Sequence, residues 1–340
     1  MRSLLVASLF ACVGCVGQSS NQASNNSLSG PFPLLCTPYT EKGEVDCAVL
    51  AKEARFVADR GANGDVWPAA KEAISLLTEE EERRGLEAIA AALEGRDAWF
   101  CPCCPGTNTA DTVRRVKVAE EIAAAHPNLR MTMLVRMAND AKDDADYRRH
   151  YEAVAAAVSH PVIVQTYNGI GPLPSAPLLV DLAKRYPETY GWYKVEGTGA
   201  GIVELMEKLV ASRPTVKTVF TGWGGRDWLY HYRRVGTRGV ITQRPQFTGL
   251  ISRIWDALEK GSPEADALFA KFLALRNLND VLSDKDMRGW NLYVLKKLGV
   301  FSNTLSRTVG KDGRRRLEDI NLRADDIAEI NARLKFAGIE

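Results

Sequence analysis

Two side chains in the middle of the sequence have the types and the spacing that imine chemistry needs. Tyr167 ends the run 161–167, and Lys194 lies 27 residues later, in the run 191–195. Both runs are short and apolar, as buried β-strands are, and one helix-length segment separates them. Parallel barrels carry their catalytic residues at the C-terminal ends of the strands. We therefore expect both side chains at one barrel mouth, where a lysine that has lost its proton is a nucleophile.

The segments around this pair alternate between strand and helix. The strand candidates are 33–37, 64–67, 98–103, 130–136, 161–167, 191–195, 216–222 and 239–242. The helix candidates are 47–61, 78–93, 109–126, 145–158, 176–187, 200–212, 226–235 and 246–260. Eight alternations predict an α/β fold, a (β/α)8 TIM barrel. An open doubly wound sheet is the competing fold, but it favours a glycine-rich phosphate loop after the first strand, and residues 36–43 are not one.

The C-terminal part of the chain has a different pattern. Helical periodicity recurs at 263–281, 286–298 and 320–337, and we expect no further strands there. The predicted organisation is therefore a barrel over residues 30–260 with a C-terminal helical extension over residues 261–340.

The first 29 residues have the pattern of an export leader. A basic start at Met1-Arg2-Ser3 precedes the apolar run 4–16, which is too short to span a bilayer, and a polar linker follows. This order predicts a secretory signal peptide, and Cys15 resembles the lipid-attachment cysteine of a bacterial lipoprotein. We expect an exported protein, periplasmic or lipid-anchored. The alternative is a cytoplasmic enzyme with a frayed N-terminal extension.

Composition argues against several classes of partner and site. A net charge of +2 over 340 residues gives no reason to expect nucleic acid as a partner. Cys101 and Cys104 have metal-binding spacing, but no second such pair lies in the folded part, and the four histidines show no zinc-type spacing. We expect these cysteines to pack as small apolar residues, and we expect no metal.

Three further motifs accompany the tyrosine and the lysine along the chain. The motifs are Thr37-Pro38-Tyr39 with Gly43-Glu-Val-Asp46, Gly222-Trp-Gly-Gly225 with residues 236–242, and residues 293–299. In this order and spacing, from about residue 30 to the C-terminus, they resemble the dihydrodipicolinate synthase/N-acetylneuraminate lyase family. The resemblance implies class I aldolase chemistry without a cofactor, in a homo-oligomer that is a tetramer or dimer. Lys194 would form an imine with a 2-oxo acid, and Tyr167 would transfer protons.

The turn after the second strand departs from the family pattern. Family members usually carry two hydroxyl side chains there, whereas this chain reads Pro68-Ala69-Ala70-Lys71-Glu72. The resemblance still implies that the backbone amides of Ala69 and Ala70, and Ile241 of the late motif, lie at the bound substrate.

Two more positions depart from the pattern. A second relay tyrosine is absent beyond the fourth strand, where Arg136 would be either an anion clamp or a partner in a barrel-rim salt bridge. The arginine that dihydrodipicolinate synthases place after the tyrosine is missing from residues 168–174, so we do not expect lysine biosynthesis.

Three functional hypotheses follow. The first is a Schiff-base lyase, of the aldolase or dehydratase type, that acts on a 2-oxo acid, including one derived from a sugar acid. The second is a non-catalytic exported barrel that binds a small acidic ligand. The third, a metal-dependent hydrolase, is disfavoured because strand ends lack clusters of histidine and carboxylate.

Overall fold

The computed structural model describes residues 27–68, 74–169, 171–282, 287–309, 312, 314–319 and 322–339, with the backbone alone at 287 and 288. Cys15, Ala69 and Ala70, which the sequence singled out, lie outside the described residues. Within those ranges, no helix is both long enough and apolar enough to cross a bilayer.

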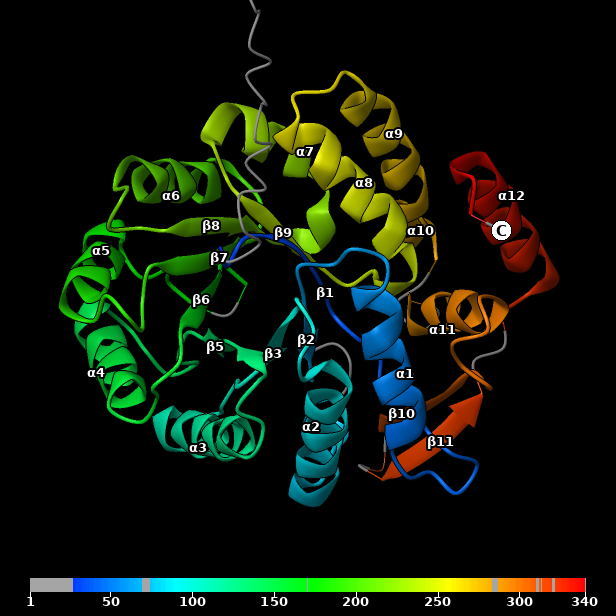
Figure 1. Cartoon of the computed structure of the whole chain (residues 1–340), viewed down its shortest axis with the longest axis horizontal. Helices are drawn as coiled ribbons and strands as arrows, with labels where there is room; N and C mark the ends of the chain where they lie inside the picture. The colour runs from blue at the N-terminus through cyan, green and yellow to red at the C-terminus, as the bar shows by residue number, and fades with distance from the viewer. Residues whose placement is uncertain are drawn as a thin grey trace, which may run out of the picture.

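A ring of parallel strands forms the centre of the molecule (Figure 1). One sheet has the order β1-β9-β8-β7-β6-β5 and the other has the order β2-β3-β4. Single bridges between Leu34 and Val66 and between Cys103 and Leu134 join the two sheets, so the ring closes. The strands are β1 (Gly30–Pro33), β2 (Gly64–Trp67), β3 (Trp99–Pro102), β4 (Arg130–Met131), β5 (Met133–Arg136), β6 (Val162–Tyr167), β7 (Trp192–Glu196), β8 (Thr218–Thr221) and β9 (Gly239–Thr242).

Helices follow the strands and surround the ring (Figure 1). They are α1 (Cys47–Ala58), α2 (Glu79–Leu93), α3 (Thr109–Ala125), α4 (Asp144–Ala155), α5 (Ala176–Arg185), α6 (Ala200–Ala211), α7 (Trp228–Tyr230) and α8 (Thr248–Glu259). This arrangement confirms the predicted TIM barrel. The segment expected to be one α-helix over 226–235 is divided instead. α7 covers only Trp228–Tyr230, and a wider π-helical turn follows over His231–Val235.

Side-chain caps anchor the helix starts at the barrel mouth. The hydroxyl of Thr78 accepts a hydrogen bond from the Glu81 amide, and the Glu81 carboxylate accepts one from the Thr78 amide. This reciprocal pair satisfies amides that the first turn of α2 leaves without helical partners. Single caps begin four other helices, at Asp46, Asn108, Asp143 and Ser175.

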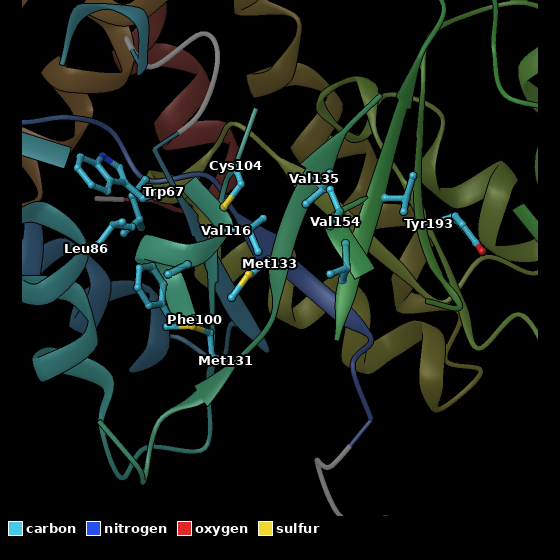
Figure 2. Close-up of a cluster of buried hydrophobic side chains, with 14 of the residues drawn as sticks. Trp67, Leu86, Phe100, Cys104, Val116, Met131, Met133, Val135, Val154 and Tyr193 are labelled. Carbon is cyan, nitrogen blue, oxygen red and sulfur yellow. The ribbon is translucent and has the colours of Figure 1, made fainter. Parts of the chain in front are cut away.

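Two apolar layers stabilise the barrel. The layer inside the ring is formed by Leu28, Phe32, Leu34, Val66, Cys101, Cys103, Leu134, Ile163, Trp192, Phe220 and Ile241. The second layer lies between the ring and the helices, where Figure 2 shows Trp67, Phe100 and Met133 among the packed side chains. Alternate residues of each strand enter the two layers, as the two-residue period of a strand requires.

The cysteines after the third strand belong to these layers. Cys101 and Cys103 lie inside the ring, and Cys104 lies in the outer layer. All three are buried and none is in a disulfide. Their placement agrees with the expected role as small apolar packing residues.

A glycine in α2 lets the largest outer-layer side chain approach closely. A Cβ at Gly85 would lie 2.2 Å from the ring of Trp67, so any other residue there would displace the indole. The Trp67 Nε1 donates to the Thr37 hydroxyl at 3.1 Å, which satisfies the one polar atom of this buried ring.

The C-terminal extension corrects one prediction, because strands do follow residue 260. The hairpin of β10 (Leu305–Val309) and β11 (Arg315–Asp319) is antiparallel. Helices precede and follow it, on the side of the ring where α1 and α8 lie (Figure 1). These helices are α9 (Glu264–Arg276), α10 (Leu278–Val281), α11 (Met287–Lys297) and α12 (Ala324–Ala337).

Arg307 of β10 holds the hairpin against the barrel, and this explains why an isolated two-stranded ribbon persists. Its guanidinium contacts the Glu81 carboxylate at 2.6 and 2.8 Å and donates to the carbonyls of Leu76 and Gly43. It also lies over the Tyr39 ring at 4.6 Å. Hydrogen bonding from Arg307 lowers the pKa of Glu81 to about 2.

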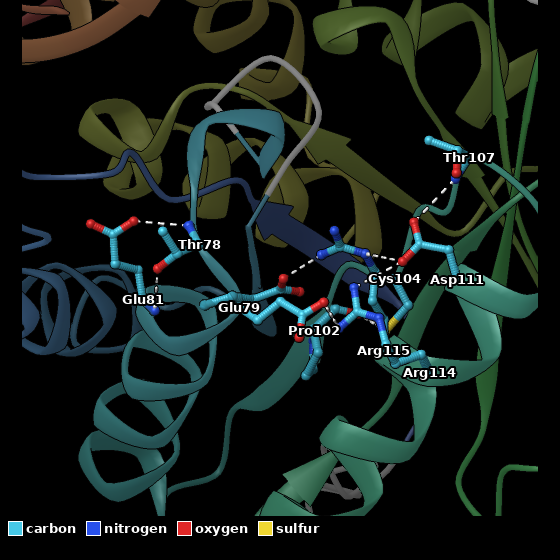
Figure 3. A network of polar contacts seen from close by, with 10 residues as sticks. Thr78, Glu79, Glu81, Pro102, Cys104, Thr107, Asp111, Arg114 and Arg115 are labelled. Atoms are coloured by element: carbon cyan, nitrogen blue, oxygen red, sulfur yellow. Dashed lines mark hydrogen bonds and ion pairs between the residues drawn. The ribbon is translucent and has the colours of Figure 1, made fainter. Parts of the chain in front are cut away.

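A second ionic network joins α2 to α3 beside the loop after β3 (Figure 3). Arg114 pairs with Glu79 at 3.2 Å and with Asp111 at 2.8 Å. Asp111 also accepts from the Thr107 amide at 3.2 Å. These contacts fix the loop between β3 and α3, at the same end of the barrel as the helix caps.

Candidate active site

Lys194 lies inside the barrel, near the C-terminal end of β7, and its side chain is 3% exposed. The strand register pairs Arg136 of β5 with Gln165 of β6, and Gln165 with Lys194. Paired residues of neighbouring parallel strands share a face, so these three form a polar row across the barrel. Earlier residues of β6 and β7, Ile163 and Trp192, belong to the apolar interior beneath that row.

Glu196 is the acidic partner of this lysine. It lies two residues further along β7, on the same face, and its Oε2 is 2.9 Å from Lys194 Nζ. Gln165 Nε2 donates to the same carboxylate, and the Trp223 amide donates to Oε1 at 3.3 Å. Both carboxylate oxygens therefore accept hydrogen bonds.

This set of donors keeps Glu196 ionised. Burial acts to raise the pKa of the carboxyl, but the charge of Lys194 and the donated hydrogen bonds outweigh it, so the pKa is lowered from 4.5. Close to neutral pH the site therefore holds a carboxylate next to the lysine nitrogen.

Gly222 provides the space that Glu196 occupies. A Cβ at Gly222 would lie 2.7 Å from the Glu196 Cβ, closer than two such atoms can approach. The glycine of the late motif is therefore required by the position of a carboxylate on the neighbouring strand.

Tyr167 lies at the end of β6, and its ring contacts Trp223. Its register partner is Glu196, so it lies on the interior face, two residues beyond Gln165 on the same strand. Its ring stacks on Trp223, with centroids 5.9 Å apart and planes at 26°. Among the described contacts, none joins the Tyr167 hydroxyl to Lys194.

Trp223 connects the carboxylate and the tyrosine. It is a non-glycine residue with φ of +53°, a left-handed conformation that costs about 1–2 kcal/mol. Its amide binds Glu196 and its ring packs on Tyr167. The strained backbone thus brings the ends of β6, β7 and β8 together around one point.

The remaining predicted residues lie at different depths. Ile241 is buried inside the ring, where it pairs with Phe32. Arg136 is partly exposed, and its carbonyl contacts His150 Nε2 at 3.1 Å. Within the described part of the chain, no ion pair involves its guanidinium, so the barrel-rim salt bridge finds no support there.

A thiol forms part of the floor beside this row. Burial raises the pKa of Cys103 to about 11, although the positive charges of Lys194 and Arg136 act in the opposite direction. Cys103 is therefore a neutral thiol at ordinary pH. Across the described residues, no three histidine, cysteine or acidic side chains are arranged to hold a metal ion.

Sequence reasoning missed Glu196, Gln165 and Trp223. The first two carried a usable signal, since Gln165 precedes Tyr167 by two residues and Glu196 follows Lys194 by two. The period of a strand places each on the same face as its neighbour. Trp223 carried no such signal, because its role depends on a backbone conformation.

Comparison with known proteins identifies relatives of similar sequence, although no family model matches the chain. A 4-hydroxy-tetrahydrodipicolinate synthase of Chlorobaculum parvum is 27% identical over 265 residues, covering 77% of this chain and 85% of the relative. The enzyme of the same description from Salinibacter ruber is 26% identical over 194 residues, covering 57% and 61%.

Solved structures show the same fold. Dihydrodipicolinate synthase of Cyanidioschyzon merolae, with lysine bound, superposes with a TM-score of 0.76 at 19% identity, over 92% of this chain and 99% of that one. The enzyme from Aquifex aeolicus gives a TM-score of 0.74 at 18% identity, over 92% and 98%. These similarities are those of a divergent relative of the dihydrodipicolinate synthase/N-acetylneuraminate lyase family. The resemblance read from the sequence motifs is thereby confirmed.

Both of these relatives are described as 4-hydroxy-tetrahydrodipicolinate synthases. The present chain places a carboxylate next to the buried lysine near the end of β7.

Proposed function

We propose that the protein is a Schiff-base lyase, of the aldolase or dehydratase type, that forms an imine between Lys194 and a 2-oxo acid. The observation that carries this proposal is the burial of Lys194, which is 3% exposed inside the barrel at the catalytic end of β7. Burying an ammonium and its partner carboxylate is costly and adds little stability, which makes a functional role the better explanation.

Arg136 is suited to the substrate carboxylate. It lies two strands from Lys194 in the same row, which separates their Cα atoms by about 10 Å. A guanidinium binds a carboxylate through two parallel hydrogen bonds. The amides of Ala69 and Ala70, and Ile241, are the other proposed substrate contacts, and Tyr167 is the proposed proton-transfer group above the imine.

We propose further that the substrate differs from that of the two synthases to which the chain is similar. Residues 168–174 lack the arginine expected of a dihydrodipicolinate synthase, and the turn at 68–72 lacks the family's hydroxyl donors. A carboxylate site without those donors favours another 2-oxo acid, such as one derived from a sugar acid.

The location and the assembly also belong to the proposal. The order of charge, apolar run and polar linker over residues 1–29 supports export, with Cys15 as a lipid-attachment site. A homo-oligomer, tetramer or dimer, is proposed from family membership. Light scattering of the purified protein measures the oligomeric state directly, and a single monomeric mass would contradict the proposed homo-oligomer.

Imine trapping tests the function. The protein is incubated with pyruvate and a panel of 2-oxo acids, reduced with borohydride and weighed by mass spectrometry, with Lys194→Ala as the control. We expect an adduct with at least one acid and none in the variant. Folded protein that forms no adduct with any of them contradicts the proposal. Saturable binding of the same acid without an adduct would instead favour a non-catalytic binding barrel.

A further inference from the structure

Resting on the proposed imine chemistry, we propose that Glu196 is the acid and base catalyst of imine formation at Lys194. Its Oε2 lies 2.9 Å from the reacting nitrogen, within direct proton-transfer distance. Among the described residues, no other titratable side chain is in recorded contact with that nitrogen. Tyr167, the group expected from the sequence, makes its recorded ring contact with Trp223 instead.

The surroundings of Glu196 hold one oxygen toward the lysine and the other away from it. Oε1 accepts from the Trp223 amide at 3.3 Å, while Gln165 Nε2 and Lys194 Nζ approach Oε2. Gly222 leaves room for the side chain and no more. A carboxylate oriented in advance in this way loses little entropy when the reaction begins.

The steps balance without another reactant. The Glu196 carboxylate accepts one proton from the Lys194 ammonium, and the free amine attacks the ketone carbon, forming the C–N bond while the carbonyl electrons move to oxygen. Glu196 gives its proton to that oxygen, accepts a second proton from nitrogen, and gives it to the new hydroxyl. Water leaves as the nitrogen lone pair forms the C=N bond. The products are a protonated imine, one water and the original carboxylate.

The neighbouring thiol does not compete for this role. Cys103 faces the same row, but its pKa is raised to about 11, so it holds its proton throughout the ordinary pH range. A thiol that is already protonated has no free site for a proton from the ammonium.

The test compares rates of adduct formation under borohydride trapping, using the acid that the wild-type protein accepts. Glu196→Gln keeps the size and the hydrogen-bond acceptor but cannot take a proton, and we expect it to form the Lys194 adduct about 100-fold more slowly. Glu204→Gln is the matched control, because Glu204 forms an exposed pair with Lys208 on α6. That control should react at the wild-type rate.

A second pair of variants separates catalysis from packing. Glu196→Asp keeps the carboxylate and should recover part of the rate. Glu196→Ala should be slow, and added formate, a small carboxylate that fits the vacated space, should accelerate it, whereas formate should leave Lys194→Ala inert. Melting curves verify that each variant is folded.

The outcomes distinguish the two proposals. A wild-type protein that forms no adduct contradicts the proposed function itself. A wild-type adduct together with Glu196→Gln reacting at the same rate overturns the role of Glu196 and leaves the function intact. Slow reaction of Glu196→Ala that formate does not restore, in folded protein, overturns it as well.

Discussion

At the scale of single residues, the site depends on how close Glu196 lies to Lys194. The two residues are two positions apart on β7, so their side chains share a face. Hydrogen bonds from Gln165 and from the Trp223 amide hold the carboxylate in place. Sequence reasoning found the lysine, because a strand-ending lysine in a barrel is a recognisable pattern. It missed the carboxylate, although the two-residue period of a strand places Glu196 on the same face as Lys194.

Gly222→Ala tests this dependence. The added methyl group would lie 2.7 Å from the Glu196 Cβ and must push the carboxylate from its position. We expect adduct formation to slow by about 10- to 100-fold, since displacement of a catalytic group by about 1 Å costs that much. Gly201→Ala is the control, because a Cβ at Gly201 meets nothing within 4 Å. Equal rates in the two variants would contradict the packing argument.

At the scale of elements, the barrel strands were predictable and the C-terminal hairpin was not. β2 and β9 have the bounds that their apolar runs predicted. β1 spans Gly30–Pro33, whereas the sequence predicted a strand over 33–37. Prolines such as Pro31 and Pro33 are unfavourable inside a strand, yet this segment pairs with β9 in regular parallel register. The hairpin exists through Arg307 and its distant partner Glu81, a contact between segments 226 residues apart that no local pattern reveals.

Removing that contact should loosen the hairpin. Arg307→Ala leaves a partly buried carboxylate without its partner, and we expect the free energy of unfolding at neutral pH to fall by roughly 3 kcal/mol. Urea unfolding measures it. Arg316→Ala, which removes an exposed pair with Asp312, is the matched control and should cost less than about 1 kcal/mol.

Acid should reduce the difference in unfolding free energy between wild type and Arg307→Ala, because the contact of Arg307 with Glu81 depends on an ionised carboxylate. The pKa of Glu81 is about 2 in the folded protein and 4.5 ordinarily, so its stabilising effect is fully present above 4.5. The effect is lost as pH falls through 2, where the carboxyl is protonated in both states. A difference in unfolding free energy that stays constant down to this pH would contradict the assignment.

At the scale of the whole molecule, the closed ring explains why the fold was predictable from so divergent a sequence. Each strand contributes alternate residues to two apolar layers, and this pattern needs volume and period rather than particular residues. The polar row at the mouth has no such tolerance, because its residues must face one another. Arg136, Gln165 and Lys194 form this row.

The first 26 residues, which belong to the proposed export leader, should be separable from the barrel. Leu28 is buried with the interior cluster and β1 begins at Gly30, so a chain that starts at residue 27 should keep the fold and the adduct-forming activity. Loss of folding in the shortened chain would contradict this prediction.

N-terminal analysis of protein from membrane and soluble fractions tests the export proposal. An intact Met1 in the cytosol would contradict export.

Peptide mapping after borohydride reduction with a 2-oxo acid locates the lysine that forms the imine. We expect the modified residue to be Lys194, at the mouth of the barrel. An adduct on another lysine, such as Lys217, which precedes β8 at the opposite end of the barrel, would contradict it.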